Sequence, residues 1–289
     1  MIAFVFPGQG SQHRGMGQGL FDTVREYRAV EGEVDALLGY SLRKLCLEDA
    51  GNRLKETQYT QPALYVVNAL HYYKAVSEGV KPQYLAGHSL GEYSALLAAG
   101  VFDFLTGLRL VVKRGELMSQ ARNGGMAAVT GVNAAKIAQV LREQGLSNVE
   151  VANFNAPLQT VLSGSLEEIK RVGPAFESAG GQVWPLQVSA AFHSRFVADA
   201  ARAFAEFLAP ASFTAPRVPV IANVSAQPYP SQNPSETVRS LLVKQMTQPV
   251  QWKQTIRYLL SQGVTEFREL GPNTVLTRLI HQIRQGPES

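Results

Sequence analysis

The sequence predicts an α/β fold with a mainly parallel sheet and a smaller subdomain inserted into it. Three observations indicate this fold class. Short apolar runs rich in β-formers alternate with longer stretches of helical periodicity along most of the chain. One of these runs leads through a Gly-x-Ser-x-Gly turn directly into a helix, and a middle segment follows the order βαββαβ instead. Alternating strands and helices are typical of parallel sheets, because each parallel connection needs a crossover.

The first 123 residues contain two predicted strands and four predicted helices. The apolar runs at residues 2–6 and 83–86 are the strands. Residues 7–19 hold five glycines and are expected to form a loop. Helical periodicity predicts helices over residues 27–38, 60–77, 92–99 and 105–120. Pro62 is expected in the first turn of its helix, where a proline is tolerated.

The middle of the chain changes character and predicts a ferredoxin-like insert. Strands are expected over residues 126–132, 149–153, 159–163 and 182–186, with helices over residues 134–144 and 166–178. The order βαββαβ is that of a ferredoxin-like unit. Turn residues bound the segment, Asn123-Gly124-Gly125 before it and Trp184-Pro185 at its end. We therefore assign residues 124–188 to a small subdomain, and residues 1–123 together with 189–289 to a large one.

After the insert the chain returns to the large subdomain. We expect a helix over residues 196–208, a strand over residues 218–223, helices beginning at Glu236 and at Trp252, and a last strand over residues 267–270. Residues 285–289 are expected to fray. The sequence contains no internal repeat and no low-complexity segment.

Composition narrows the class of protein. The 289 residues are 45% hydrophobic and 17% charged, which is typical of a globular protein with a sizeable core. Lys and Arg outnumber Asp and Glu by 27 to 23 but form no basic run, so no nucleic-acid partner is expected. No stretch approaches the ~18 apolar residues of a membrane helix, and no basic region precedes the first apolar run. Cys46 is the single cysteine, so no internal disulfide is expected. These features predict a cytoplasmic protein with no membrane partner.

The segment Gly87-His88-Ser89-Leu90-Gly91 fits the nucleophile-elbow pattern Gly-x-Ser-x-Gly. The predicted strand before it and helix after it are the context that the pattern requires. The turn between them has to be sharp, so small residues beside the serine let the backbones pack closely. The hydroxyl then stands at a helix N-terminus, whose free N–H groups favour developing negative charge. This arrangement predicts covalent acyl chemistry on a hydrolase-like large domain. The alternative is a serine that only caps the helix.

Ser89 needs a base, and five histidines are candidates. His88 precedes the nucleophile, and its side chain should point away from that of Ser89. His71 lies in a helix beside tyrosines and is expected to be structural, whereas His13 in the glycine-rich loop stays open. His193 follows small residues where a helix begins, and the chain order serine then histidine is that of α/β-hydrolases. His193 is therefore the candidate base, with a capping or packed histidine as the alternative.

A set of short motifs runs nearly end to end along the chain. They are Phe6-Pro7-Gly8-Gln9-Gly10-Ser11-Gln12, Tyr59-Thr60-Gln61-Pro62-Ala63, Gly87-His88-Ser89-Leu90-Gly91-Glu92, Lys113-Arg114-Gly115, Asn153-Phe154-Asn155-Ala156-Pro157, Ala191-Phe192-His193-Ser194, Gln245, Pro249-Val250-Gln251-Trp252 and Gly271-Pro272. In this order the set resembles the malonyl-CoA:acyl carrier protein acyltransferases (S-malonyltransferases), which load extender units for fatty acid and polyketide synthesis. One motif alone would be weak, but the ordered set is specific.

The resemblance implies a catalytic role for several residues. Ser89 matches the nucleophile that takes malonyl as an ester, and His193 matches its base and later acid. The backbone carbonyl of Gln245 matches the group that orients the imidazole, so no carboxylate completes a triad and the Gln245 side chain is expected to matter little. The backbone N–H groups of Gln9 and Leu90 match the oxyanion hole.

The resemblance also implies how the substrate is bound. Arg114 matches the residue that grips the free carboxylate of malonyl through two parallel hydrogen bonds. Phe192 matches the malonyl-selective pattern, in which a bulky ring crowds the methyl group of methylmalonyl at ~1–3 kcal/mol. Asn155 is expected near the entrance, where the insert meets the large domain. No cofactor and no metal are implied, because malonyl-CoA and the phosphopantetheine arm of the carrier protein are substrates.

One stretch departs from the fatty-acid enzymes. Residues 189–196, SAAFHSRF, lack the proline or glycine before the Phe-His pair and the proline after the serine. This pattern resembles the discrete acyltransferases that serve modular polyketide synthases in trans, those of the disorazole synthase type, and the chain begins and ends like a free-standing enzyme. The implied partners are acyl carrier protein domains of a polyketide synthase, whose acidic surface Lys and Arg near the cleft would steer.

Two other interpretations stay open at this point. An acyl hydrolase or thioesterase acting on carrier-bound acyl groups could use the same elbow, with Asp103 or Glu116 as the third member of a triad. Arg114 argues against it, because neutral acyl chains carry no carboxylate. A non-enzymatic scaffold for synthase components is the second, and the presence of Ser89, His193 and Arg114 in one chain argues against that.

Overall fold

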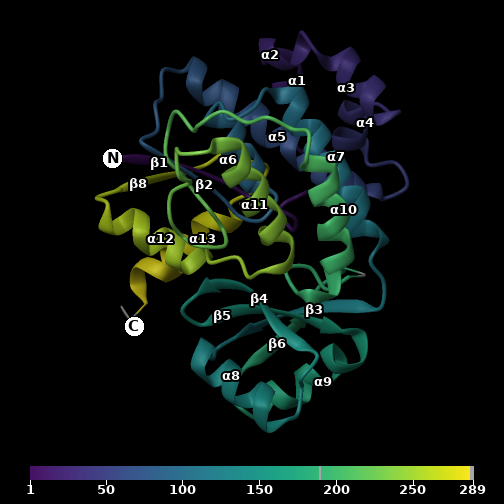
Figure 1. Cartoon of the computed structure of the whole chain (residues 1–289), viewed down its shortest axis with the longest axis vertical. Helices are drawn as coiled ribbons and strands as arrows, with labels where there is room; N and C mark the ends of the chain where they lie inside the picture. Colours follow the sequence, from purple (N-terminus) through teal and green to yellow (C-terminus); the bar gives the residue numbers. More distant parts are fainter. Residues whose placement is uncertain (189, 287–289) are drawn as a thin grey trace.

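The computed structural model describes residues 1–188 and 190–286, which form two four-stranded sheets. A larger unit is built around one sheet, and a smaller unit lies at one end of the long axis of the molecule (Figure 1). The predicted fold class is confirmed: a hydrolase-like α/β unit with a mainly parallel sheet carries a ferredoxin-like insert.

The large sheet is parallel throughout its paired strands. It contains β1 (Ile2–Phe6), β2 (Tyr84–Gly87), β7 (Val220–Ile221) and β8 (Glu266–Glu269), in the spatial order β7-β2-β1-β8. Val5 of β1 lies opposite Ala86 on one side and Glu269 on the other. The carboxyl ends of these strands meet at one edge, which is where α/β sheets bind ligands. The segments that follow β1, β2 and β7 therefore come together there.

Helices precede, connect and follow these strands. The first part of the chain contributes α1 (Leu20–Thr23), α2 (Arg25–Arg28), α3 (Glu31–Leu38), α4 (Leu42–Glu48), the 3₁₀ turn η1 (Arg53–Lys55), α5 (Thr57–Ser77), α6 (Gly91–Ala98) and α7 (Phe104–Gln120). The last part contributes η2 (Arg195–Val197), α10 (Ala198–Leu208), α11 (Pro234–Thr247), α12 (Trp252–Ser261) and α13 (Val275–Gln285). None of the helices within the described ranges is long and apolar enough to span a membrane.

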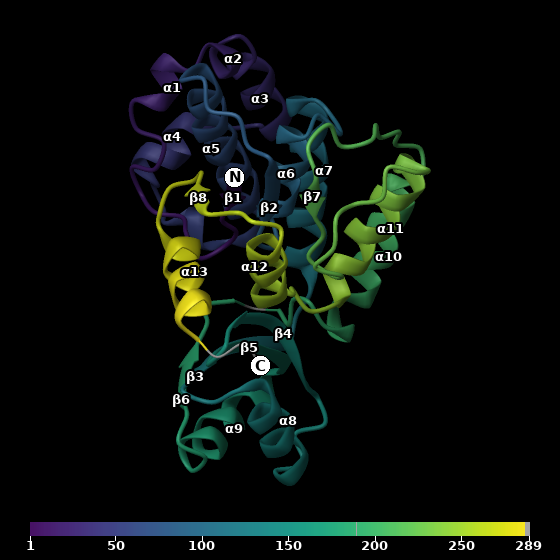
Figure 2. The ribbon, with the colours of Figure 1, turned by 90° about the vertical axis from the view of Figure 1, so that its left-hand side faces the viewer.

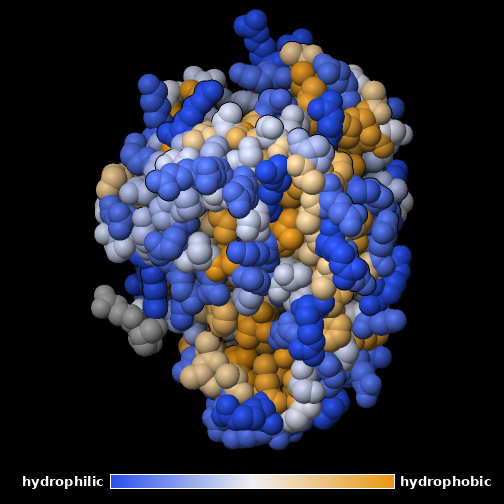
Figure 3. Space-filling model, viewed as in Figure 1, coloured by the Kyte–Doolittle hydropathy of each residue, from blue (hydrophilic) through white to orange (hydrophobic). Residues whose placement is uncertain are grey.

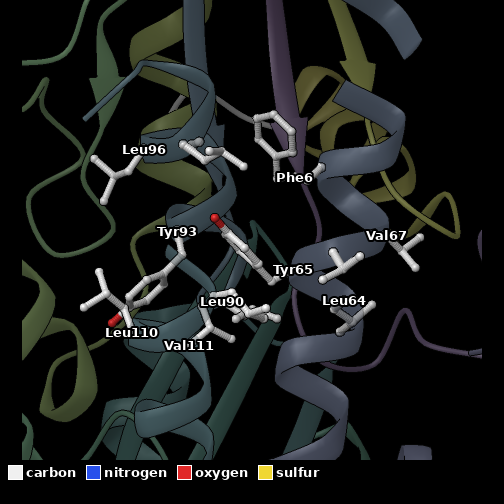
Figure 4. Packing of buried hydrophobic residues seen from close by; sticks show 14 of the residues in the cluster. Phe6, Leu64, Tyr65, Val67, Leu90, Tyr93, Leu96, Leu110 and Val111 are labelled. Carbon is white, nitrogen blue, oxygen red and sulfur yellow. The ribbon is translucent and has the colours of Figure 1, made fainter. Parts of the chain in front are cut away.

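Apolar side chains of β1 alternate between two cores, because successive residues of a strand point to opposite faces of its sheet. Phe4 and Phe6 join the core formed with α5, α6 and α7, whereas Ala3 and Val5 join the core formed with α12 and α13. Figure 4 shows Phe6 and Tyr65 of α5 among the buried side chains of the first of these cores. The sheet is therefore a layer between two cores, and a site is expected at its carboxyl edge.

The small subdomain is an antiparallel sheet backed by two helices. Its elements are β3 (Gly124–Thr130), α8 (Ala134–Glu143), β4 (Val149–Ala156), β5 (Gln159–Ser165), α9 (Leu166–Glu177) and β6 (Gln182–Pro185). The strand order β4-β5-β3-β6 is that of a ferredoxin-like unit. Ile137 of α8 and Val172 of α9 pack against this sheet in a core of their own. Figure 2 shows both helices on the side of the small sheet that is away from the large unit.

The two units are joined by more than their connecting chains. Phe154 of β4 donates its N–H to the Val250 carbonyl at 2.9 Å, and Val250 donates its N–H to the Ala152 carbonyl at 2.8 Å. These hydrogen bonds tie the strand β4 to the segment between α11 and α12. The small sheet therefore lies beside the carboxyl edge of the large sheet. Separately, Figure 3 shows apolar side chains gathered below the middle of this face, over the small subdomain.

Some predicted boundaries were wrong. The helix expected over residues 60–77 begins at Thr57, because the N–H groups of Tyr59 and Thr60 already bond to the Glu56 carbonyl. Pro62 therefore lies past the first turn, inside α5, and not in the first turn as expected. The helix expected over residues 27–38 is interrupted at Val30, whose φ of −126° and ψ of 7° leave the helical region.

Other elements differ in length. The strand expected over residues 218–223 pairs only at Val220–Ile221, since its hydrogen bonds to β2 stop there. The strand expected over residues 149–153 continues to Ala156, which places Asn155 within β4. Ser189, the first residue of the SAAFHSRF stretch, and residues 287–289 of the expected frayed end lie outside the described residues.

Candidate active site

Ser89 lies in a sharp turn between β2 and α6. Its φ is 52°, a left-handed value that few residues other than glycine adopt. A Cβ atom at Gly87 would lie 1.9 Å from the carbonyl carbon of Gly91, and one at Gly91 would lie 2.0 Å from the Phe6 oxygen. Both positions therefore require glycine, because strand, turn and helix touch there. The strained turn holds Ser89 in the wall of a pocket at the N-terminus of α6.

The structure brings Ser89 and His193 together. The distance from Ser89 Oγ to His193 Nε2 is 2.8 Å. His193 Nδ1 lies 2.7 Å from the backbone carbonyl oxygen of Gln245. A carbonyl can only accept, so Nδ1 carries the proton and Nε2 presents its lone pair to the serine hydroxyl. The arrangement is a nucleophile beside a base whose tautomer is fixed by the third group.

The protonation of His193 is set by its surroundings. Burial, and after it the positive charge of Arg114, lower the pKa of His193 to about 3, against the opposing effect of the hydrogen bond to the Gln245 carbonyl. The imidazole is therefore neutral at neutral pH and can accept the Ser89 proton. The same low basicity favours release of that proton to a leaving group.

Neither carboxylate considered for a triad reaches His193. Asp103 caps α7, where its Oδ1 accepts the Thr106 N–H at 2.7 Å. Glu116 forms a salt bridge with Lys113 at 3.1 Å on the outer side of the same helix. The Gln245 carbonyl occupies the position at Nδ1 that a triad carboxylate would take. The geometry is that of a Ser-His dyad.

The other histidines considered as bases lie away from the Ser89 hydroxyl. His88 Nε2 is 2.8 Å from Asn155 Oδ1, and its ring packs edge-on against Trp252. His13 is exposed and its ring nitrogens meet the backbone carbonyls of Arg14 and Pro272. His193 is thus the histidine that meets Ser89.

Arg114 of α7 reaches the same point from the opposite side. It is only 1% exposed. Its Nη1 donates to Gln61 Oε1 at 2.8 Å, and its Nη2 donates to Gln245 Oε1 at 3.0 Å and to Ser89 Oγ at 3.2 Å. These partners are neutral, and no salt bridge within residues 1–188 and 190–286 uses the guanidinium. A buried cation with neutral partners offers a binding point for an anionic group of a substrate.

The side chain of Gln245 is part of the site. Besides accepting from Arg114, it donates from Nε2 to the Ser89 backbone carbonyl at 2.8 Å and to Glu92 Oε2 at 2.5 Å. The expectation that this side chain matters little came from its backbone role alone. The structure adds contacts that this expectation did not include, because the amide joins the nucleophile turn to the guanidinium.

Gln9 and Leu90, the residues expected to supply backbone donors, lie in the same pocket as Ser89. Both residues line the pocket, and no hydrogen bond within the described ranges uses either backbone N–H. Gly8 lies directly on the elbow, since a Cβ atom there would be 2.4 Å from the His88 oxygen and 3.5 Å from the Leu90 nitrogen. The Gln9 side chain turns to Thr57 Oγ1. Free N–H groups in the same pocket as a nucleophile are the donors that an oxyanion hole requires.

The pocket is a small cavity of about 90 Å³. Its walls come from both units: Gln9, Gln61, His88, Ser89, Leu90, Arg114, Met118, Met126, Asn153, Leu186, Val188, Phe192 and His193. Phe192 lies in the wall, where its ring can limit the size of an acyl group. Asn155 lies where the insert meets the large unit, with its side chain turned to His88, while Asn153 lines the pocket itself. No group of three or more potential metal ligands occurs in the part of the chain that the structure describes.

Three residues of the site were missed from the sequence. Asn223 accepts the Ser89 N–H at 2.7 Å and donates to the Gly87 carbonyl at 2.6 Å, so it fastens both ends of the elbow. Gln61 and Glu92 hold Arg114 and Gln245. The signal for Asn223 was its place at the end of the strand expected over residues 218–223, whose carboxyl end lies beside that of β2. Gln61 and Glu92 lie within two of the sequence motifs, but the motifs alone assign no role to their side chains.

Comparison with known proteins gives one consistent result. The acyl transferase domain family matches residues 3–286. The chain is 51% identical to the polyketide biosynthesis malonyl CoA-acyl carrier protein transacylase PksC of Bacillus subtilis over 292 aligned positions, covering 100% of this chain and 99% of the relative.

Two solved structures have the same fold. A malonyl CoA-acyl carrier protein transacylase from Burkholderia pseudomallei superposes with a TM-score of 0.94 at 49% identity, covering 99% of each chain. A malonyl-transacylase solved in complex with a type II polyketide synthase acyl-carrier protein (PlMCAT with AntF) superposes with a TM-score of 0.91 at 37% identity, covering 98% of this chain and 92% of the other.

Proposed function

This chain belongs to the acyl transferase domain family, and on that premise we propose how its own residues perform the transfer. The reaction moves a malonyl group from malonyl-CoA to the phosphopantetheine thiol of an acyl carrier protein. The full-length identity to transacylases of this name supports both substrates.

The first half-reaction loads the enzyme. His193 Nε2 takes the proton of the Ser89 hydroxyl while Oγ attacks the thioester carbonyl carbon of malonyl-CoA. The N–H groups of Gln9 and Leu90 stabilise the oxyanion, and the N-terminus of α6 adds to that field. The carbon–sulfur bond then breaks and the imidazolium protonates the CoA thiolate. The product is a malonyl ester on Ser89.

The second half-reaction runs the same chemistry in reverse order. The thiol of the carrier's phosphopantetheine arm gives its proton to His193 and attacks the Ser89 ester. The ester carbon–oxygen bond breaks, and Ser89 recovers its proton from the imidazolium. Each half-reaction is balanced in protons, so the cycle needs no cofactor and no metal. Because CoA leaves before the carrier protein binds, the kinetics are ping-pong.

The preference for malonyl is supported by the position of Arg114 Nη2, which lies 3.2 Å from Ser89 Oγ. In a malonyl ester, one methylene separates the acyl carbon from the carboxylate. A carboxylate that close to Oγ meets the guanidinium, whose planar edge can bind both carboxylate oxygens. An acetyl ester offers nothing to this buried charge. The same charge gives no advantage to a hydrolase of neutral acyl chains.

The biological setting follows from the relatives. The full-length match to a polyketide biosynthesis transacylase supports a discrete enzyme that serves acyl carrier protein domains of a polyketide synthase in trans. The match to a transacylase in complex with a polyketide synthase carrier protein supports the same class of partner. A cytoplasmic location agrees with these substrates and completes the proposal.

A two-stage transfer assay tests this function. The protein is incubated with malonyl-CoA, freed of CoA, and then mixed with a holo-acyl carrier protein whose mass is followed. We expect malonyl to pass to the carrier from the wild type and not from Ser89→Ala. Release of free malonate, with no malonyl on the carrier, would indicate a hydrolase instead.

A further inference from the structure

Glu92 is a buried carboxyl group that none of the steps above uses. It lies in the first turn of α6 and is 1% exposed. Its Oε1 accepts hydrogen bonds from the Tyr229 hydroxyl at 2.7 Å and from the Asn223 N–H at 3.1 Å. Its Oε2 accepts from Gln245 Nε2 at 2.5 Å. A buried carboxyl with three neutral donors calls for an explanation, because burial of such a group is costly.

The contact with Gln245 determines which way its amide faces. Nε2 lies between two acceptors, Glu92 Oε2 and the Ser89 carbonyl, while Oε1 receives the Arg114 Nη2–H. The opposite orientation would turn Oε1 toward two acceptors and the NH₂ group toward a guanidinium, which can only donate. The carboxyl of Glu92 therefore selects the orientation in which Gln245 can hold Arg114.

The chemistry and the clamp depend on different atoms of Gln245. His193 is held by the backbone carbonyl, and Arg114 is held by the side-chain amide. A change that turns the amide thus leaves the Ser89–His193 dyad in place. It affects the guanidinium, whose remaining partners would be Gln61 and Ser89.

We propose that Glu92 is a positioning residue for substrate selection, which fixes the Gln245 amide and through it the carboxylate-binding edge of Arg114. The proposal rests on the proposed function, since it concerns the same site. Glu92 also lies close enough to Arg114 for the guanidinium to lower the pKa of this carboxyl, although burial has the larger effect and raises it.

The test compares acylation by malonyl-CoA with acylation by acetyl-CoA. Glu92→Gln keeps the shape of the side chain but places an NH₂ group among donors, so it opposes the present orientation of Gln245. We expect the ratio of kcat/KM for malonyl-CoA over acetyl-CoA to fall about tenfold or more, the usual effect of losing a charge-assisted contact. Acylation by acetyl-CoA should fall less than acylation by malonyl-CoA, because His193 is held by the Gln245 backbone carbonyl and not by this amide.

Tyr229→Phe is the matched control. It removes one hydrogen bond from the same carboxyl but leaves the contact with Gln245, so the malonyl-to-acetyl ratio should be retained. Gln245→Leu breaks the link from the other side and keeps the backbone carbonyl. We expect this variant to lower the ratio as well, and the double variant with Glu92→Gln to lower it no further, as a shared pathway requires.

The possible results distinguish a failure of the proposed function from a failure of the role proposed for Glu92. A wild type that takes no malonyl would overturn the proposed function. A wild type that prefers malonyl, with a folded Glu92→Gln variant that keeps the full preference, would overturn the role of Glu92 alone. If Glu92→Gln does not fold, judged by its thermal transition, Gln245→Leu decides: an unchanged ratio in that variant contradicts the proposal.

Discussion

Arg114 Nη2 and Ser89 Oγ are 3.2 Å apart, so the buried cation of the pocket touches the nucleophile itself. One consequence concerns binding, because the acyl group on Ser89 is built against a positive charge. A second concerns His193, whose pKa the same charge helps to lower. The selection of the substrate and the state of the base are therefore linked through one guanidinium.

Replacing Arg114 by alanine should reverse the order of preference among acyl groups. We expect acylation by malonyl-CoA to fall by a factor on the order of 10² or more, since a charge-assisted contact with this buried guanidinium is worth roughly 3 kcal/mol. Uncharged acetyl-CoA should be accepted at least as well as by the wild type. Steady-state rates with both thioesters check this, and full retention of malonyl preference would show that the carboxylate binds elsewhere.

Arg114→Lys tests the geometry of the clamp separately from its charge. Lysine keeps the cation but cannot present two parallel N–H groups or reach Gln61 and Gln245 together. We therefore expect a malonyl-to-acetyl ratio between those of the wild type and Arg114→Ala. A lysine variant equal to the wild type would mean that charge alone selects the substrate.

The pH dependence of acylation should reflect the low pKa of His193. Burial and Arg114 favour the neutral base, so the acid limb of kcat/KM for acylation should lie well below the ordinary histidine value of 6.5. The fraction of neutral imidazole is lost only as the pH falls toward about 3. In Arg114→Ala, measured with acetyl-CoA, the lowering effect of the Arg114 charge is gone while that of burial remains, and the limb should move to higher pH. An acid limb near 6.5 in the wild type would contradict the assigned environment.

Gly91 should tolerate no side chain. Gly91→Ala places a Cβ atom where the Phe6 carbonyl oxygen lies, so strand β1 and helix α6 would have to separate. We expect loss of acylation together with a loss of stability of several kcal/mol, on the order of other overpacked sites. Gly32→Ala is the control, since no atom lies within 4 Å of its Cβ position in α3. That variant should be as stable as the wild type or slightly more so.

Glu92 should make folding stability depend on pH. Burial raises its pKa to about 7 from an ordinary 4.5, against the lowering effect of its hydrogen bonds and of Arg114. The folded state thus holds this proton more tightly than the unfolded state, and the stabilisation present below pH 4.5 is lost as the pH rises through 7. From pH 5 to pH 8, the free energy of unfolding of the wild type should fall by about 2 kcal/mol relative to that of Glu92→Gln, which lacks the titrating carboxyl. Denaturant titrations at both pH values measure this, with Glu116→Gln on the outer side of α7 correcting for the loss of one charge.

Local sequence was enough to predict the parts of the fold that local chemistry determines. The apolar run of β1, the glycines at 87 and 91 and the βαββαβ order each carry their own constraint. The start of α5 was misplaced, because Pro62 looks like a first-turn residue while the helix gains its first turn from bonds to the Glu56 carbonyl. A proline inside a helix is tolerated when packing elsewhere holds the helix.

The site was predictable only in part, for a related reason. Ser89, His193 and Arg114 could be named from motifs, but Asn223 contacts the elbow 134 residues away along the chain. The side-chain roles of Gln245 and Glu92 depend on how three helices, α6, α7 and α11, converge on one point. An amide between a carboxyl and a guanidinium has no local signature in the sequence. Such contacts follow from the tertiary arrangement alone.

The most direct test of the central claim is the mass of the intact protein after brief exposure to equal amounts of malonyl-CoA and acetyl-CoA, with the modified peptide mapped. We expect a malonyl adduct on Ser89 that greatly exceeds any acetyl adduct and that passes to a holo-acyl carrier protein. Equal malonyl and acetyl adducts, or an adduct on a residue other than Ser89, would contradict the link between Arg114 and the nucleophile.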